Sequence, residues 1–227
     1  MTGRTYGQFC GLARALELVG ERWSLLVVRD LILGPKRFTD LREGLPRIPV
    51  SILSTRLNEL EEAGVIRRRV LPKLDAAVVY ELTEYGSELE AVLLQLGLWG
   101  ARSLGDPAAG DAFGLDTAIL SLYTTFRPEY TENVHVSFQI NYGEFVVHAV
   151  VDDGHLRVAE GELPEADLAL DLYGSIRGLA AGEITAAEAL ASGLVHIKVG
   201  DSALLDRFVE MFHIPSAPVR TYGLAVH

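Results

Sequence analysis

Apolar residues recur along the first hundred positions with the spacing of α-helices. The clearest case is the segment 50–63, where Leu53, Leu57 and Leu60 fall at i, i+4 and i+7 and form one stripe. Gly64 directly after it suits the left-handed residue that ends many helices. Similar patterns predict four more helices, over 12–19, 23–33, 38–45 and 84–104.

Two β-type segments separate the last two of these helices. Residues 65–71 and 78–83 are rich in β-branched residues, and residues 72–77 join them. That connection is too long for a two-residue hairpin turn and predicts a longer loop. Three short helices, a fourth helix and a two-stranded wing are the layout of a winged helix-turn-helix.

The pattern changes after residue 114. Val134, Val136, Phe138 and Ile140 alternate with polar residues, as expected of a half-buried strand. Further strands are predicted at 145–151, 156–160, 168–173 and 194–199, and helices at 117–126 and 175–181.

Two helix starts in this half carry capping residues. Thr185 and Glu188 have the spacing of a capping box, and Asp201 is placed to cap a last helix that reaches Phe212. From Pro215 onward we expect irregular structure.

A segment rich in Gly, Pro, Ala and Asp separates the two patterns. We therefore predict a winged-helix domain at 1–104, a linker at 105–114 and a second domain at 115–227. The predicted fold class is α+β: a winged helix-turn-helix followed by an α+β domain with an antiparallel five-stranded sheet.

Charge distinguishes the two halves. The net charge of −11 looks wrong for a DNA-binding protein, but residues 1–105 hold 14 Lys and Arg against 13 Asp and Glu, a net of +1. Residues 106–227 hold 6 against 18, a net of −12. Since DNA phosphates attract Lys and Arg, the first half is the one expected to bind DNA.

A recognition helix needs an apolar stripe inward and small or polar residues toward the major groove. The polar positions near the start of 50–63 are the candidates for base contacts: Ser51, Ser54, Thr55 and Asn58. The cations beside this helix and in the wing are the candidates for phosphate contacts: Lys36, Arg37, Arg47, Arg56, Arg68 and Lys73.

The stretch from Cys10 to Leu104 resembles the HxlR family of bacterial winged-helix regulators. The segments that carry the resemblance are 13–24, 31–41, 52–57, 60–66 and 80–86. It implies a homodimer formed by the terminal helices, whose two recognition helices contact half-sites about 34 Å apart on operator DNA.

The chain departs from the usual family pattern at Cys10-Gly11, where the family has Cys-Pro. Some family members use this cysteine as a thiol sensor, and Cys10 is a candidate redox residue on that ground. The alternative is a small residue buried in the dimer interface.

The second half resembles sterol-carrier-protein-type lipid-binding domains, most distinctively in Gly-Leu-Val-His-Ile-Lys-Val-Gly-Asp at 193–201. The resemblance implies an apolar tunnel between sheet and helices and a small hydrophobic effector. For any one candidate ligand-binding residue, ordinary core is the safer interpretation. The candidates are Tyr123, Phe126, Val136, Phe138, Phe145, Tyr173, Phe208 and Phe212.

No catalytic motif, Gly-rich phosphate loop or metal-spaced His/Cys cluster occurs in the second half, so we expect no enzyme activity, cofactor or metal. No secretory signal or membrane-length apolar run is visible, which predicts a cytoplasmic protein without membrane insertion. We expect a ligand-responsive regulator, most simply a repressor. The alternative is a protein-interaction scaffold that uses the winged helix only to dimerise.

Overall fold

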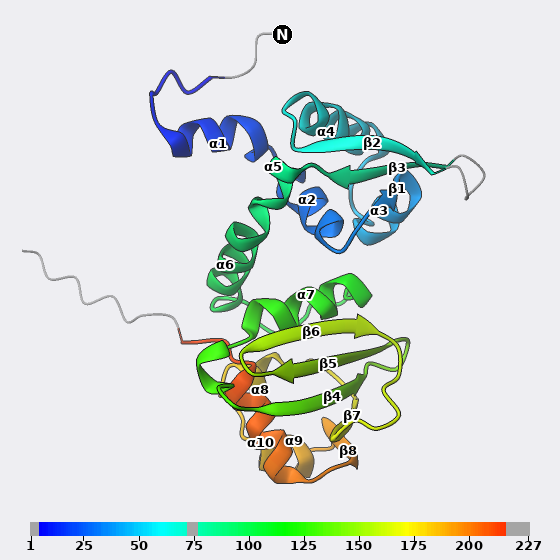
Figure 1. The fold of residues 1–227 in the computed structure, drawn as a ribbon, viewed down its shortest axis with the longest axis vertical. Helices are drawn as coiled ribbons and strands as arrows, with labels where there is room; N and C mark the ends of the chain where they lie inside the picture. The colour runs from blue at the N-terminus through cyan, green and yellow to red at the C-terminus, as the bar shows by residue number, and fades with distance from the viewer. Residues whose placement is uncertain (1–4, 72–76, 217–227) are drawn as a thin grey trace, which may run out of the picture. The chain divides into compact units, whose positions relative to one another are not determined.

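The computed structural model describes residues 5–71 and 77–216 (Figure 1). The chain divides between Leu94 and Gln95 into an N-terminal unit and a C-terminal unit. The N-terminal unit contains α1 (Gly11–Val19), α2 (Ser24–Ile32), β1 (Lys36–Arg37), α3 (Phe38–Gly44), α4 (Val50–Glu62), β2 (Ile66–Leu71), β3 (Ala77–Leu82) and α5 (Glu84–Ser87). Helix α6 (Leu89–Ala101) runs across the division.

The leucine stripe of α4 lies at the centre of the N-terminal core. Leu53, Leu57 and Leu60 are each at most 1% exposed. They share this core with residues of α2, α3 and β2, including Val27, Val28, Leu31, Leu41 and Ile66. The predicted inward face of the recognition helix is therefore confirmed.

The wing is a three-stranded sheet in the order β1-β3-β2, with both pairs antiparallel. Strand β1 was not predicted. It consists of Lys36 and Arg37 alone, which pair with Tyr80 and Val79. Two residues are too few to show an alternating pattern, so only the long-range pairing reveals them as a strand.

A tight corner connects the wing to the helices that follow. Thr83 Oγ1 donates to the carbonyl oxygen of Gly64 at 2.6 Å and accepts from the amide of Gly86 at 3.0 Å. A Cβ on Gly86 would lie 1.9 Å from the carbonyl oxygen of Val65. Only glycine permits this approach of two backbone segments.

The single helix predicted over 84–104 was wrong. Helix α5 ends at Ser87, a turn at Glu88 follows, and α6 begins at Leu89. Gly86 has low helix propensity, and the Ser87 hydroxyl donates to the carbonyl oxygen of Glu84 at 2.7 Å. These local effects interrupt a pattern whose apolar spacing alone favours one helix.

The C-terminal unit is a five-stranded sheet with helices on one face. Its strands lie in the order β6-β5-β4-β7-β8. After α7 (Leu115–Thr125) and a short 3₁₀ turn, the elements are β4 (His135–Asn141), β5 (Val146–Asp152), β6 (His155–Glu160), β7 (Leu168–Leu172), α8 (Arg177–Ala180), α9 (Ala186–Ala191), β8 (Val195–Val199) and α10 (Ser202–Met211). In Figure 1 the sheet lies in front of α8, α9 and α10.

The expected antiparallel sheet was wrong in one pair, because β4 and β7 are parallel and the sheet is mixed. The chain leaves β6 at one edge and crosses the sheet before β7 pairs with β4. Alternation along a strand reports which face is buried but not strand direction, so the sequence pattern cannot distinguish the two arrangements.

Both predicted caps in this unit are confirmed. The Thr185 hydroxyl accepts from the amide of Glu188, whose carboxylate accepts from the amide of Thr185 at 2.8 Å. The Asp201 carboxylate accepts from the amide of Leu204 at 3.0 Å. Each contact satisfies backbone donors that a helix start leaves without partners.

Candidate nucleic-acid interface

One side of α4 carries the four residues predicted to contact bases. Ser51, Ser54, Thr55 and Asn58 are all exposed, opposite the buried leucines. The Ser54 hydroxyl donates to the Val50 carbonyl at 3.0 Å, and the Thr55 hydroxyl donates to the Ser51 carbonyl at 2.9 Å. Their lone pairs can still accept hydrogen bonds from base amino groups.

Arg56, predicted as a phosphate contact, is turned toward protein carboxylates. Its side chain is 12% exposed and forms ion pairs with Glu59 at 2.7 Å and with Glu21 at 3.4 Å. Glu21 precedes α2, so the pair joins α4 to the chain between α1 and α2. The geometry gives Arg56 a part in positioning the recognition helix.

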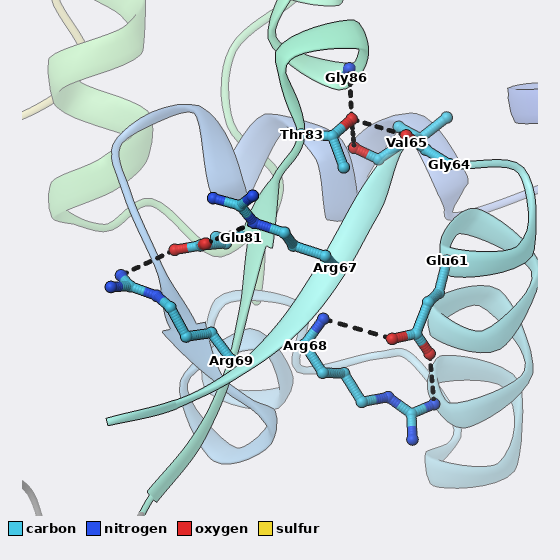
Figure 2. Close-up of polar contacts among 9 residues, drawn as sticks. All are labelled: Glu61, Gly64, Val65, Arg67, Arg68, Arg69, Glu81, Thr83 and Gly86. Carbon is cyan, nitrogen blue, oxygen red and sulfur yellow. Dashed lines mark hydrogen bonds and ion pairs between the residues drawn. The ribbon is translucent and has the colours of Figure 1, made fainter. Parts of the chain in front are cut away.

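Three consecutive arginines on β2 point alternately to the two sides of the wing, as Figure 2 shows. Arg67 Nε lies 2.7 Å from one oxygen of Glu81, and Arg69 Nη2 lies 2.8 Å from the other. The Glu81 residue is 8% exposed and sits on β3 opposite Arg67. One carboxylate thus holds two arginines on the same side of the strand.

Arg68 points to the other side and contacts α4 (Figure 2). Its Nη2 lies 3.0 Å from Glu61 Oε2 and also donates to Asn58 Oδ1. Its backbone amide donates to Glu61 Oε1 at 3.3 Å, and its guanidinium lies 5.7 Å from the centre of the Tyr80 ring. The wing and the recognition helix are therefore joined through Arg68, which was predicted to contact phosphate, and Asn58, which was predicted to contact a base.

The other predicted cations lie around the start of α3 and α4. Arg37 is exposed on β1, where its backbone amide donates to Asp40 at 2.8 Å, while Lys36 is partly buried. Arg47 is exposed just before α4. Lys73 lies outside the described residues.

A groove next to α4 is lined partly by residues that were not predicted as site residues. It has a volume of about 450 Å³ and is lined by Glu21, Arg22, Trp23, Arg47, Pro49, Ile52 and Arg56. Trp23 has a φ of 81°, unusual for a bulky residue, and the Arg22 guanidinium lies 5.3 Å from its ring. Arg22 adds a cation to this end of α4, and only its charge could have signalled it.

The predicted ligand residues of the C-terminal unit do not form one site. Four of them form an aromatic cluster between the sheet and α10. The Phe138 ring centre lies 5.1 Å from that of Phe208 and 5.9 Å from that of Phe212, which in turn lies 5.7 Å from Phe126. Phe138, Phe208 and Phe212 are at most 3% exposed, so they fill the core.

The remaining four are placed elsewhere. Phe145 stacks on Tyr142 with ring centres 5.1 Å apart. The Tyr123 hydroxyl accepts from the amide of Val158, and Val136 is partly buried on β4. Tyr173 is 71% exposed.

Cys10 is exposed directly before α1. Hydrogen bonds from the backbone amides of Ala13 and Leu12 lower the pKa of its thiol. A thiolate at a helix start is stabilised by these donors and by the helix dipole.

The features of α3, α4 and β1–β3 define a DNA-binding winged helix-turn-helix. A polar exposed face lies over a buried stripe on α4, α3 precedes it, and a wing rich in arginine follows. Residues 18–107 match the model of the HxlR-like helix-turn-helix family.

Individual relatives agree with this match. HTH-type transcriptional regulator YodB of Bacillus subtilis (strain 168) is 41% identical over 85 residues, which cover 37% of this chain and 76% of the relative. The uncharacterized HTH-type transcriptional regulator YtcD of the same organism is 37% identical over 107 residues, covering 47% and 84%. The chain belongs to the HxlR-like helix-turn-helix family and is a transcriptional regulator.

Among solved structures, the reduced form of YodB from B. subtilis is 37% identical to this chain, with a TM-score of 0.38. The matched region is 44% of this chain and 100% of the YodB chain. The family match ends at residue 107, so most of the C-terminal unit lies beyond it. Every helix within 5–71 and 77–216 is too short or too polar to span a membrane.

Proposed function

We propose that the chain binds operator DNA as a homodimer, with α4 in the major groove and the wing along the phosphate backbone. The observation that carries the proposal is the exposed polar face of α4, with Ser51, Ser54, Thr55 and Asn58 above a fully buried leucine stripe. Hydroxyl and amide groups at such positions can form hydrogen bonds with base edges without blocking entry into the groove.

The proposed dimer uses apolar side chains that the single chain leaves exposed. On α1 and just before it these are Phe9, Leu12 and Leu16. On α6 they are Val92, Leu96 and Trp99, which fall at i, i+4 and i+7 on one helical face. Trp99 is 69% exposed, a large apolar surface to leave in contact with water. A second copy that supplies the same two helices would cover them.

Retention on double-stranded DNA at several salt concentrations tests this proposal directly. A dimer that neutralises several phosphates should lose affinity steeply as salt rises, with log K falling linearly against log salt. Light scattering should give twice the chain mass. Retention should weaken in Ser54→Glu, which puts a carboxylate toward the groove, and persist in the matched surface variant Ser216→Glu.

The scaffold alternative makes the opposite prediction. A winged helix that serves only to dimerise would give the same mass by light scattering but no retention on DNA at low salt. Repression is the expected outcome of operator binding. A reporter gene placed behind the selected operator tests whether the protein lowers or raises expression.

For the C-terminal unit we propose a small hydrophobic effector, bound between the sheet and α10. The support is the aromatic cluster of Phe126, Phe138, Phe208 and Phe212, an apolar lining of the kind such ligands use. Because these rings pack against one another, binding would require them to move apart. Native mass spectrometry of the purified protein tests for a co-purified hydrophobic compound.

An effector alters DNA affinity only if it prefers one conformation of the protein. A compound that binds the full chain but leaves its operator affinity unchanged would refute the coupling while leaving the binding site intact.

A second proposed control is oxidation at Cys10. Its exposure and the lowered pKa of its thiol are the two properties a thiol sensor needs. The test compares release from DNA after diamide treatment in the wild type and in Cys10→Ser. Equal release in both proteins would eliminate Cys10 as the sensor.

A further inference from the structure

The contact between Arg68 and Asn58 restricts what Asn58 can recognise. Asn58 lies on the exposed face of α4, and Arg68 approaches it from β2. A guanidinium carries only donors, so the amide atom that faces it must be the oxygen Oδ1. The amino group Nδ2, with its two donors, is then the part of Asn58 left to meet DNA.

Several contacts hold Arg68 in this position. The two hydrogens of its Nη2 match two acceptors, Asn58 Oδ1 and Glu61 Oε2, the latter at 3.0 Å. The other Glu61 oxygen accepts from the Arg68 backbone amide, and the Tyr80 ring lies beneath the guanidinium. Because Glu61 also neutralises its charge, Arg68 is better suited to orient Asn58 than to bind phosphate.

The orientation of the amide changes its preferred base. Asparagine recognises adenine with both atoms, since Oδ1 accepts from N6 and Nδ2 donates to N7. Oδ1 keeps a second lone pair, but the Arg68 guanidinium beside it repels a further donor such as adenine N6. Asn58 therefore offers mainly its own donors at Nδ2. Guanine offers two acceptors in the major groove, O6 and N7, whereas adenine offers one acceptor beside a donor.

We propose that Arg68 is a specificity-determining residue that acts through Asn58, turning it from an adenine-recognising into a guanine-recognising side chain. The proposal rests on the proposed binding of α4 in the major groove. Arg69 provides the matched control. It is the next residue on the same strand, carries the same charge and pairs with Glu81 on β3.

The experiment is selection of the full-length protein against a randomised double-stranded DNA library, followed by measured affinities for the selected site with G or A at each position. Asn58→Ala identifies the position that Asn58 contacts, because preference there disappears. At that position the wild type should favour G. Arg68→Ala should shift the G-to-A affinity ratio toward A by roughly tenfold, and Arg69→Ala should leave it unchanged.

Arg68→Met is the second variant, since it keeps the apolar stem over Tyr80 and removes every donor. It should shift the ratio as Arg68→Ala does, even if alanine perturbs folding. The proposal is overturned if both variants keep the wild-type preference for G, if the wild type favours A, or if Asn58→Ala changes no position. A wild type that binds no DNA at low salt overturns the proposed function itself.

Discussion

The two units place their candidate functional residues in opposite ways. In the N-terminal unit the base-contact candidates Ser51, Ser54 and Asn58 are exposed, and a separate set of leucines below them forms the core. In the C-terminal unit the candidate ligand residues Phe138 and Phe212 are themselves the core. Recognition can therefore change without loss of stability in the first unit, whereas in the second the two properties share side chains.

Several arginines of the N-terminal unit have contacts inside that unit. Arg56, Arg67, Arg68 and Arg69 all pair with glutamates of the same unit. The Arg68 pair joins the wing to the recognition helix, whereas the Arg67 and Arg69 pairs join β2 to β3 within the wing. They also reduce the net positive charge available to phosphates, so we expect exposed cations such as Arg37 to matter more for DNA affinity.

The largest effect is expected in the C-terminal core. Phe138→Ala removes a fully buried ring that packs against Phe208 and Phe212. Its loss should lower the free energy of unfolding by about 3–5 kcal/mol, because apolar burial is lost and a cavity remains. Urea denaturation followed by circular dichroism measures the change.

The matched control is Tyr173→Ala, which removes a ring that is 71% exposed and should cost little. If Phe138→Ala were as stable as this control, the aromatic cluster would not be a packed core, and the contrast between the two units would fail.

The second effect concerns the corner at Gly86. Gly86→Ala would place a Cβ 1.9 Å from the Val65 carbonyl oxygen, so the start of β2 must shift. We expect a loss of about 1–3 kcal/mol, as for other substitutions that overpack a rigid site. Thermal unfolding measures it.

Gly100→Ala is the comparison variant, since a Cβ there meets no heavy atom within 4 Å. Alanine is favoured over glycine inside a helix by about 0.5–1 kcal/mol, so this variant should gain stability. If Gly86→Ala gained stability as Gly100→Ala is expected to do, helix propensity and not close approach would decide the outcome at Gly86.

The sequence predicted most elements of both units because their apolar spacing is regular. The stripe of Leu53, Leu57 and Leu60 and the alternation in 134–140 each correspond to a buried face in the structure. What it could not predict depends on contacts between distant segments. The parallel pairing of β4 with β7 and the short strand β1 are both of this kind.

The same limit applies to the candidate site. Polar spacing placed Ser51, Ser54, Thr55 and Asn58 on one helical face, which the structure has. Charge alone marked Arg56 and Arg68 as cations near DNA, but it does not report their partners. Glu21 lies 35 positions before Arg56 in the chain, and no local pattern connects the two.

The third effect separates a phosphate contact from an internal ion pair. Arg37→Ala should leave stability unchanged and reduce the slope of log K against log salt by about 0.9, the value for one lost phosphate contact. Arg56→Ala should instead lower the free energy of unfolding by about 1–3 kcal/mol, because it removes a nearly buried side chain that forms ion pairs with two carboxylates. DNA titrations at several salt concentrations and urea denaturation distinguish them. The reverse result would make Arg56 the phosphate contact.

The smallest effect is at the capping box of α9. Thr185→Ala removes the hydroxyl that accepts from the Glu188 amide and should cost about 1 kcal/mol, whereas Thr185→Ser keeps that acceptor. The hydrogen bond from the Thr185 amide, and then that from its hydroxyl, lower the pKa of Glu188 below its ordinary 4.5.

A carboxyl group whose pKa is lower in the folded protein stabilises the fold fully above its unfolded pKa. The stability difference between wild type and Glu188→Gln should therefore stay constant above that pKa and disappear as the pH falls through the folded value. Denaturation at a series of pH values measures this difference. If this difference persisted unchanged under strongly acidic conditions, Glu188 would stabilise the helix start by packing and not by its charge. The helix start would then be stabilised in the same way as the aromatic core.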